Sequence, residues 1–150
     1  MRKRGRKMNK RAQAFQEYLQ ENNIDCFNAE DINDELNTTA FRSHMEIAGQ
    51  RIPLVVILDD SIYGMLRLQI APKALKETNK QAILEYINEL NRQYKVFKYY
   101  VTTDGDLCLD CCVLCEAEQA NGSMVYTIMN VILTHLAEEY PVLMRKVWAE

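Results

Sequence analysis

Four cysteines stand close together in the pattern Cys108-Leu-Asp-Cys111-Cys112-Val-Leu-Cys115. Two consecutive C-x-x-C units of this kind could supply the four thiolates of a zinc site, or thiols for redox chemistry. Residues 107–113 follow an Asp-Gly hairpin signal, however, and are predicted to form a strand. In a strand that rises about 3.3 Å per residue, Cys108 and Cys112 lie roughly 13 Å apart on one face, and Cys111 and Cys115 are equally far apart on the other. Neither pair could then share a zinc ion or form a disulfide.

A zinc site here would also need two chain turns, yet no Gly, Pro or Asn occurs between Cys108 and Cys115. We therefore expect the cysteines to act as small apolar side chains. A metal site, a redox thiol and a dimer-forming thiol remain the alternatives for this cluster. Cys26 lies alone in a polar segment and is expected to be exposed, and five cysteines without a signal peptide fit a reducing compartment. The predicted core face of the strand consists of Leu107, Leu109, Cys111, Val113 and Cys115.

The acidic residues Asp104, Asp106 and Asp110 fit a solvated hairpin turn better than a calcium site. Started at Asp104, the EF-hand pattern would need a glycine where Leu109 stands and a glutamate where Cys115 stands. We therefore do not expect calcium to bind at this turn.

The two histidines, His44 and His135, lie in no catalytic motif, and the sequence contains no H-E-x-x-H, G-x-S-x-G or P-loop pattern. His44 falls on the polar face of a predicted strand, and His135 lies beside Leu136 in a predicted helix. A cysteine–histidine dyad assembled from distant segments remains an alternative. We predict a protein that is not an enzyme, with no catalytic, metal-binding or cofactor-binding residues and no cofactor.

Hydrophobic periodicity predicts the elements that carry these residues. Phe15, Tyr18 and Leu19 are spaced for a short helix over about 9–22, whereas residues 24–39 are polar and acidic and are expected to hold at most one helical turn near 31–36. The other predicted elements are strands over 41–47, 52–58 and 62–70, a helix that begins with a Thr78–Gln81 capping box and runs to about 94, strands over 95–102 and 107–113, and a helix over 125–147 that Pro141 should kink or restart.

The predicted order of elements is α-β-β-β-α-β-β-α, with no internal repeat and no linker. The chain has 150 residues, enough for one domain, and its 5 Gly and 3 Pro exclude a collagen-like or low-complexity protein. No run approaches the roughly 18 apolar residues of a membrane span, so no membrane insertion is expected. These features predict a single α+β domain over 10–150, in which helices pack on an antiparallel sheet.

The charges are unevenly distributed along the chain. Seven of the 18 Lys and Arg residues lie within residues 1–11, which contain no acidic residue, so the remainder is strongly acidic. We expect residues 1–9 to be a disordered leader, or to reflect a start codon assigned too early, with translation beginning at Met8. The alternative is an arm that binds nucleic acid or an anionic membrane. No apolar segment of a secretory signal follows, which favours a cytoplasmic protein. Because an acidic body repels phosphate, the folded domain is not expected to bind nucleic acid.

Three segments, together with the element order, resemble the bacterial YbjN family, which is grouped with the type III secretion chaperone-like fold. LVVILDDSIYGMLRLQI (54–70) resembles the central hairpin of that family. AILEYINELNRQYKVFKYYVTTDGDLCL (82–109) resembles its second helix, the short strand that follows and an acidic Gly turn. EEYPVLMRKVW (138–148) resembles the tyrosine–proline step of the last helix. With the first helix, the resemblance covers about residues 10–149.

The resemblance implies a small cytoplasmic protein with no catalytic centre. Members of the family are described as sensory-transduction regulators, or as similar to acidic chaperones that hold an extended segment of a secreted partner. The related chaperones are dimers, which makes a homodimer an expectation here too. The family supplies no catalytic or ligand residues, and the basic leader and the five cysteines depart from its pattern.

The main functional hypothesis is therefore a non-enzymatic regulatory or chaperone-like module that captures a protein partner or peptide segment. Capture is expected at a sheet edge or in an apolar groove beside the first helix, with acidic rim residues selecting basic partners. The candidate contact residues are Phe15, Tyr18 and Leu19, for which ordinary core packing is the alternative. The alternative function is a metal- or thiol-dependent sensor or enzyme built on the cysteine cluster.

Overall fold

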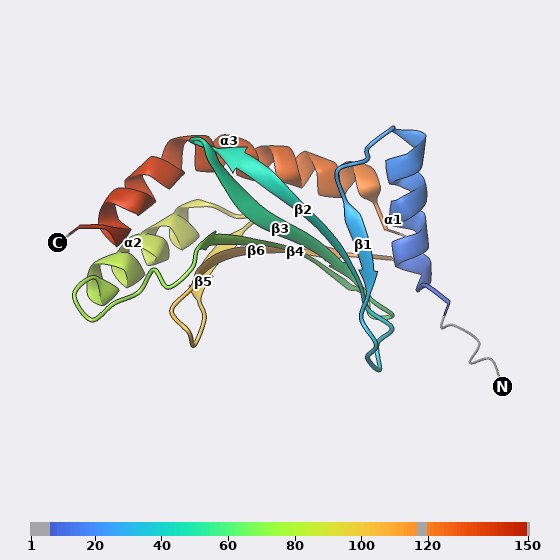
Figure 1. Ribbon diagram of the computed structural model, residues 1–150, viewed down its shortest axis with the longest axis horizontal. Coiled ribbons are helices and arrows are strands. Elements are labelled where there is room, and N and C mark those ends of the chain that lie inside the picture. The colour runs from blue at the N-terminus through green and yellow to red at the C-terminus, as the bar shows by residue number, and fades with distance from the viewer. Residues whose placement is uncertain (1–6, 117–119, 150) are drawn as a thin grey trace.

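The computed structural model describes residues 7–116 and 120–149, and in this part of the chain three helices and six strands follow one another in the order α-β-β-β-β-α-β-β-α (Figure 1). The prediction of a single α+β domain is confirmed. The elements are α1 (Lys10–Glu21), β1 (Asn28–Asp31), β2 (Thr39–Ile47), β3 (Gln50–Leu58), β4 (Tyr63–Ala71), α2 (Lys80–Gln93), β5 (Lys98–Val101), β6 (Leu107–Leu114) and α3 (Gly122–Val147).

The strands form one antiparallel sheet in the spatial order β1-β2-β3-β4-β6-β5. A two-residue turn joins β2 to β3, and its residues Ala48 and Gly49 have φ angles of 50° and 77°. Positive φ at both positions is what a type I′ hairpin turn requires, and this turn matches the right-handed twist of the two strands. The turn therefore fixes the register in which Ile47 pairs with Gln50.

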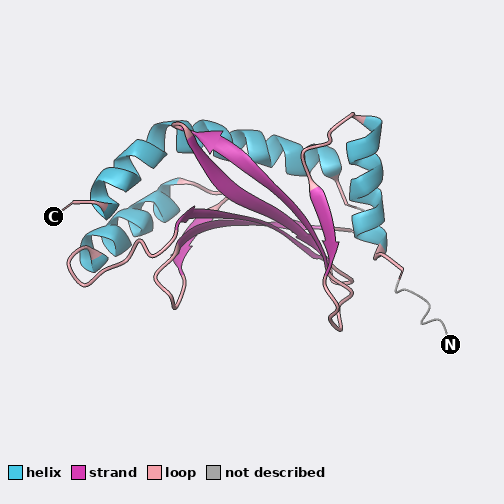
Figure 2. Ribbon diagram, in the orientation of Figure 1, coloured by secondary structure: helices cyan, strands magenta, loops and turns pink. Residues whose placement is uncertain are grey.

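The three helices all pack on one face of the sheet, as Figure 2 shows. Phe15 of α1 is completely buried and makes edge-on ring contacts with Phe27 and Phe41, at centroid distances of 5.8 and 4.9 Å. The same core receives the apolar stripes of α2 and α3, which the helical spacing had predicted. Its largest fully buried side chains are Phe15, Phe41, Phe97, Leu58, Leu66, Leu68, Ile83, Leu107, Leu109, Ile132, Leu136 and Leu143.

Strand β1 was not predicted, and the helical turn expected near residues 31–36 is wrong. All four side chains of β1 are exposed, so the strand has no apolar face for a sequence pattern to show. Its pairing with β2 holds it in place, with added bonds from Arg42 to Glu30 and from Thr39 to Asp31. The residues after β1 instead form a turn in which the Asp34 carboxylate accepts from the main chain of Thr38.

The predicted capping box at Thr78 and Gln81 is also wrong. The helix begins one residue later, with Asn79 at the N-cap position, and no side chain caps its first turn. Asn79 is buried because its amide donates to the carbonyl oxygens of Ala74 and Val147 and accepts from the main-chain N–H of Lys76. The side chain of Asn79 therefore bonds the end of α3 and does not cap α2.

Helix α3 continues through Pro141 and does not restart there. Proline removes only one main-chain donor, and a helix can absorb that loss by bending. Figure 1 shows the C-terminal part of α3 curving toward α2. At the other end of the helix, the side chain of Asn121 accepts a hydrogen bond from the N–H of Met124 and so caps the first turn.

Residues 1–6 of the predicted leader lie outside the described residues, but its last residues belong to the fold. Asn9 is only 3% exposed. Its side chain accepts from the N–H of Ala12 and donates to the carbonyl oxygens of Asn37 and Leu58, so it both caps α1 and ties the helix to the sheet. None of the helices in the described part of the chain is long and apolar enough to cross a membrane.

Candidate functional site

The face of the sheet opposite the helices is uncovered in the described part of the chain (Figure 2). Side chains alternate between the two faces along each strand, so every second residue of β2, β3, β4 and β6 points to this side. We call this side the open face. One row across its middle joins Arg42, Val55, Arg67 and Asp110, which are direct neighbours on four adjacent strands.

A groove of about 440 Å³ lies on the open face. Pro53 and Val55 of β3 contribute apolar surface to it, and arginines from the strands on either side flank Val55. Because neighbouring strands lie about 4.8 Å apart, the Cα atoms of Arg42 and Arg67 are roughly 10 Å apart. The lining residues are Arg42, Ser43, Pro53, Leu54, Val55, Arg67, Gln69, Tyr100, Thr102, Asp106 and Cys108.

Both arginines of the groove are held by carboxylates. Arg67 donates to both oxygens of Asp110 at 2.9 to 3.2 Å, and this bonding raises the pKa of the guanidinium. Its Cζ atom also lies 5.9 Å from the ring centre of Tyr100. Arg42 donates to Glu30 at 2.8 Å in a more exposed pair. In the groove, two arginines held in ion pairs therefore flank an apolar floor, which is the surface of Pro53 and Val55.

The Cys108 thiol and the Tyr100 hydroxyl of the groove stay neutral near pH 7. Burial is the main cause that raises the pKa of the Cys108 thiol, and burial together with the nearby Asp110 charge raises the pKa of Tyr100 to about 12. A thiol with a raised pKa is a poor nucleophile and a poor metal ligand. The groove is thus suited to holding a partner through contact and hydrogen bonding.

The four clustered cysteines divide between the two faces of the sheet, as the strand geometry predicted. Leu107, Leu109, Cys111, Val113 and Cys115 are buried on the core side, which confirms the predicted core face. Cys108 and Cys112 alternate with them and belong to the open face, where Cys112 is exposed. Burial also raises the pKa of the Cys111 and Cys115 thiols. In residues 7–116 and 120–149, no three His, Cys, Asp or Glu side chains are placed to hold a metal ion.

The open face carries an apolar area next to the groove, at the start of β4 and the end of β6. Tyr63 and Leu114 are directly paired across these strands and are 57% and 65% exposed. The neighbouring pair on the same face consists of Met65 and Cys112. Paired exposed side chains of this size are suited to contact with another molecule.

The candidate contact residues of the first helix are mostly core residues. Phe15 and Leu19 are buried, which confirms ordinary packing for these two side chains. Tyr18 is partly buried, lies against Gly122 of α3, and lines a hollow between the two elements. The exposed thiol expected at Cys26 is confirmed.

The sequence prediction missed the open face as a site, although it placed its residues correctly within strands. Arg42 and His44 lie in the strand predicted over 41–47, and Arg67 and Gln69 lie in the strand predicted over 62–70. Alternation shows that a strand has two different faces, but it does not show which face the helices will cover.

The two histidines have different surroundings. His44 is on the open face, where the guanidinium of Arg51 lies 3.0 Å from its Nδ1 atom. His135 is buried among Tyr94, Phe97 and Tyr99, and its Nε2 atom is 2.6 Å from the Tyr99 hydroxyl oxygen. Burial lowers the pKa of His135, and burial raises that of Tyr99, so this pair is neutral and serves the packing of α3 on the sheet.

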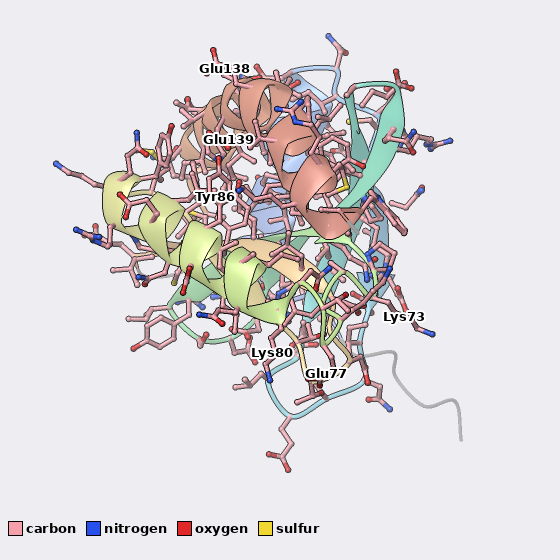
Figure 3. All side chains as sticks on the ribbon, turned by 90° about the vertical axis from the view of Figure 1, so that its left-hand side faces the viewer. Lys73, Glu77, Lys80, Tyr86, Glu138 and Glu139 are labelled. Carbon is pink, nitrogen blue, oxygen red and sulfur yellow. The ribbon has the colours of Figure 1, made fainter. Side chains whose placement is uncertain are left out.

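A polar contact also joins the two long helices. The hydroxyl of Tyr86 on α2 donates to the Glu139 carboxylate on α3 at 2.7 Å, and Figure 3 shows these residues facing each other. Burial and this hydrogen bond raise the pKa of Tyr86 to about 12. Lys146 lies 4.6 Å from the centre of the Tyr86 ring. The contact holds α2 against α3 on the covered face, away from the groove.

Comparison of the chain with protein-family models and with curated proteins finds no match. The resemblance to the YbjN family therefore stays a prediction.

Proposed function

We propose that the protein is a non-enzymatic binding module of the YbjN type that holds an extended segment of a partner protein on its open face. The observation that carries this proposal is the groove of about 440 Å³ on a sheet face that no described helix covers. A sheet normally buries one face against helices, and an apolar groove left on the other face is a common feature of ligand-binding surfaces.

The groove can recognise a peptide by shape and by apolar contact. Pro53 and Val55 offer a rigid apolar floor, while Arg42 and Arg67 are already held by Glu30 and Asp110. Because the arginines are preorganised, little side-chain entropy is lost when a partner binds beside them. We infer that apolar side chains of the partner supply most of the affinity.

The rim of the groove favours basic residues next to those apolar side chains. Asp106 lines the groove and accepts from the main-chain N–H of Lys73, and the carboxylates of Glu30 and Asp110 lie close by. Glu30 and Asp110 offset the charges of Arg42 and Arg67, so Asp106 leaves the groove with a net negative charge, which would attract basic residues of a partner and repel acidic ones.

A cytoplasmic location belongs to the same proposal. Cys26 and Cys112 are free and exposed, and neither is paired with another described cysteine. Exposed thiols persist as thiols in a reducing compartment.

Selection of peptides from a random displayed library tests the proposal, because it requires no assumption about which protein is the partner. We expect the selected peptides to share apolar residues next to Lys or Arg. A photoreactive group built into such a peptide should cross-link to residues of the groove, such as Gln69 or Tyr100. Cross-links confined to the helices would overturn the proposal.

A further inference from the structure

Five basic residues and a tryptophan lie at the end of the molecule where α2 begins and α3 ends. The two segments are side by side because the Asn79 amide donates to the carbonyl oxygen of Val147 at 3.1 Å. Figure 1 shows this end on the opposite side of the molecule from α1, and Figure 3 looks at it directly. We call it the basic tip. Its residues are Lys73, Lys76, Lys80, Arg145, Lys146 and Trp148.

The basic tip has an excess of positive charge. Residues 72–80 and 141–150 contain five cations and two carboxylates, whereas the whole chain has a net charge of −3. In the described part of the chain, none of the five cations forms an ion pair. Four of them are exposed, and the ammonium of Lys146 lies on the ring of Tyr86. Positive charge that the fold does not neutralise attracts an anionic partner.

The carboxylates around the tip offset only part of this charge. Asp104 and Asp106 lie on the neighbouring turn, and Asp106 accepts from the main-chain N–H of Lys73. Glu139 already accepts a hydrogen bond from α2. Glu77 is exposed within the loop that precedes α2. The negative charge is therefore greatest beside Lys73, and the surface formed by the start of α2 and the end of α3 stays basic.

Trp148 is the most exposed large apolar side chain among the described residues, with 69% of its surface accessible. The ammonium of Lys76 lies 4.8 Å from the centre of its ring, a cation–π contact that holds the ring at the surface next to the cations. An indole ring has a large apolar body and a polar N–H group, and such rings are enriched where a membrane meets water.

We propose that the basic tip binds the surface of an anionic membrane, with Trp148 in the headgroup region and no helix inserted. Four of the five cations are lysines, which are depleted in protein–protein interfaces, whereas arginine is enriched there. The composition of the tip therefore favours lipid headgroups over a protein partner. Each basic side chain near an anionic bilayer raises the affinity about fivefold.

The shape of the molecule favours a membrane over a nucleic acid. Helix α3 has 26 residues and is therefore about 39 Å long, which is several times the distance over which salt screens charge. A membrane that touches the tip leaves most of the acidic body out of range, whereas a nucleic-acid strand would run along that body and be repelled. None of the five cations lines the groove, so the open face stays accessible.

The fluorescence of Trp148 tests the proposal, because this is the only tryptophan of the chain and it reports contact at the basic tip rather than at the leader. The full chain is titrated with phosphatidylcholine vesicles in which about a third of the lipid is phosphatidylserine. We expect the emission to shift to shorter wavelength, and brominated acyl chains to quench it. Both effects should weaken as salt is added and be absent with pure phosphatidylcholine.

Two charge variants locate the contact. Lys80→Glu should weaken vesicle binding about tenfold or more, and the fold should be retained because a carboxylate stabilises the first turn of a helix. Lys95→Glu is the matched control: it makes the same change of charge just beyond the other end of α2, roughly 20 Å away, and should leave the affinity unchanged. Trp148→Ala should also weaken binding, measured by sedimentation with the vesicles.

A shift in emission that anionic vesicles cause, and that Lys80→Glu weakens more than Lys95→Glu does, would support the proposal. Vesicle binding that leaves the Trp148 emission unchanged would place the contact elsewhere and overturn it. The absence of vesicle binding, equal effects of the two charge variants, or a shift caused by a single-stranded oligonucleotide but not by vesicles would overturn it as well.

Discussion

The amide of Asn79 joins the loop before α2 to the last turn of α3 through three hydrogen bonds to main-chain atoms. Asn79→Ala would leave the carbonyl oxygens of Ala74 and Val147 buried without a donor, and should lower the free energy of unfolding by about 2–3 kcal/mol. Thr78→Ala is the matched control, because Thr78 is exposed and should change stability by less than about 0.5 kcal/mol. Urea denaturation measures both. Equal effects of the two substitutions would contradict the role of Asn79. A larger effect of Thr78→Ala would favour the capping box predicted at Thr78 and Gln81.

His135 should make stability depend on pH. Burial lowers its pKa below the ordinary value of 6.5, while Glu138 and Glu139 partly oppose this. As the pH falls below about 6.5, the unfolded chain binds a proton that the folded chain does not, so the free energy of unfolding decreases until the pH reaches the lowered pKa. The slope is at most about 1.4 kcal/mol per pH unit.

The variant His135→Gln isolates this contribution, because an amide can still bond the Tyr99 hydroxyl but does not titrate in this range. Urea denaturation between about pH 7.5 and 5 should show a shallower fall in stability for the variant than for the natural chain. The same slope in both proteins would rule out His135 as the titrating group.

The junction of α1 and α3 depends on the absence of a side chain at Gly122. A Cβ atom at this position would overlap the Cβ, Cγ and Cδ1 atoms of Tyr18. Gly122→Ala should therefore destabilise the protein by about 1–3 kcal/mol, and the added cost should decrease in a Tyr18→Ala background, which removes the overlaps with Cγ and Cδ1 and keeps only the Cβ contact at 2.8 Å. Thermal unfolding of the two single variants and the double variant measures this coupling. Additive effects would show that the two helices adjust independently.

The elements with a buried face were predictable, and those without one were not. Residues 52–58 form most of β3 and residues 63–70 form most of β4, as predicted, because their apolar side chains enter the core. Strand β1 has no buried side chain, so only its pairing with β2 defines it. The start of α2 was placed one residue early because the capping pattern uses only neighbouring residues. The side chain of Asn79 instead bonds the carbonyl oxygen of Val147 in α3, a contact that no local pattern shows.

At the scale of the whole molecule, the open face depends on where three helices pack. Each helical stripe was predictable by itself, but periodicity does not show that α1, α2 and α3 cover the same side of the sheet. The groove also combines β3 and β4 with Tyr100 of β5 and Cys108 of β6, which are distant in sequence. The candidate site therefore depends on the order of the strands in the sheet and on the side that the helices cover. The sequence pattern alone predicted only which strand positions are polar and which are apolar.

Filling the groove should abolish binding and preserve the fold. In the variant Val55→Glu, the new carboxylate would lie between Arg42 and Arg67, occupy the apolar floor and bond to the arginines. Val131→Glu is the matched control, because Val131 is exposed on α3, outside the groove.

The most direct test of the central claim is the affinity of a selected peptide for the natural chain and these two variants, measured by fluorescence anisotropy. The open face as binding site predicts that Val55→Glu weakens binding at least about tenfold and that Val131→Glu leaves it unchanged. Equal affinity for all three proteins would contradict the claim.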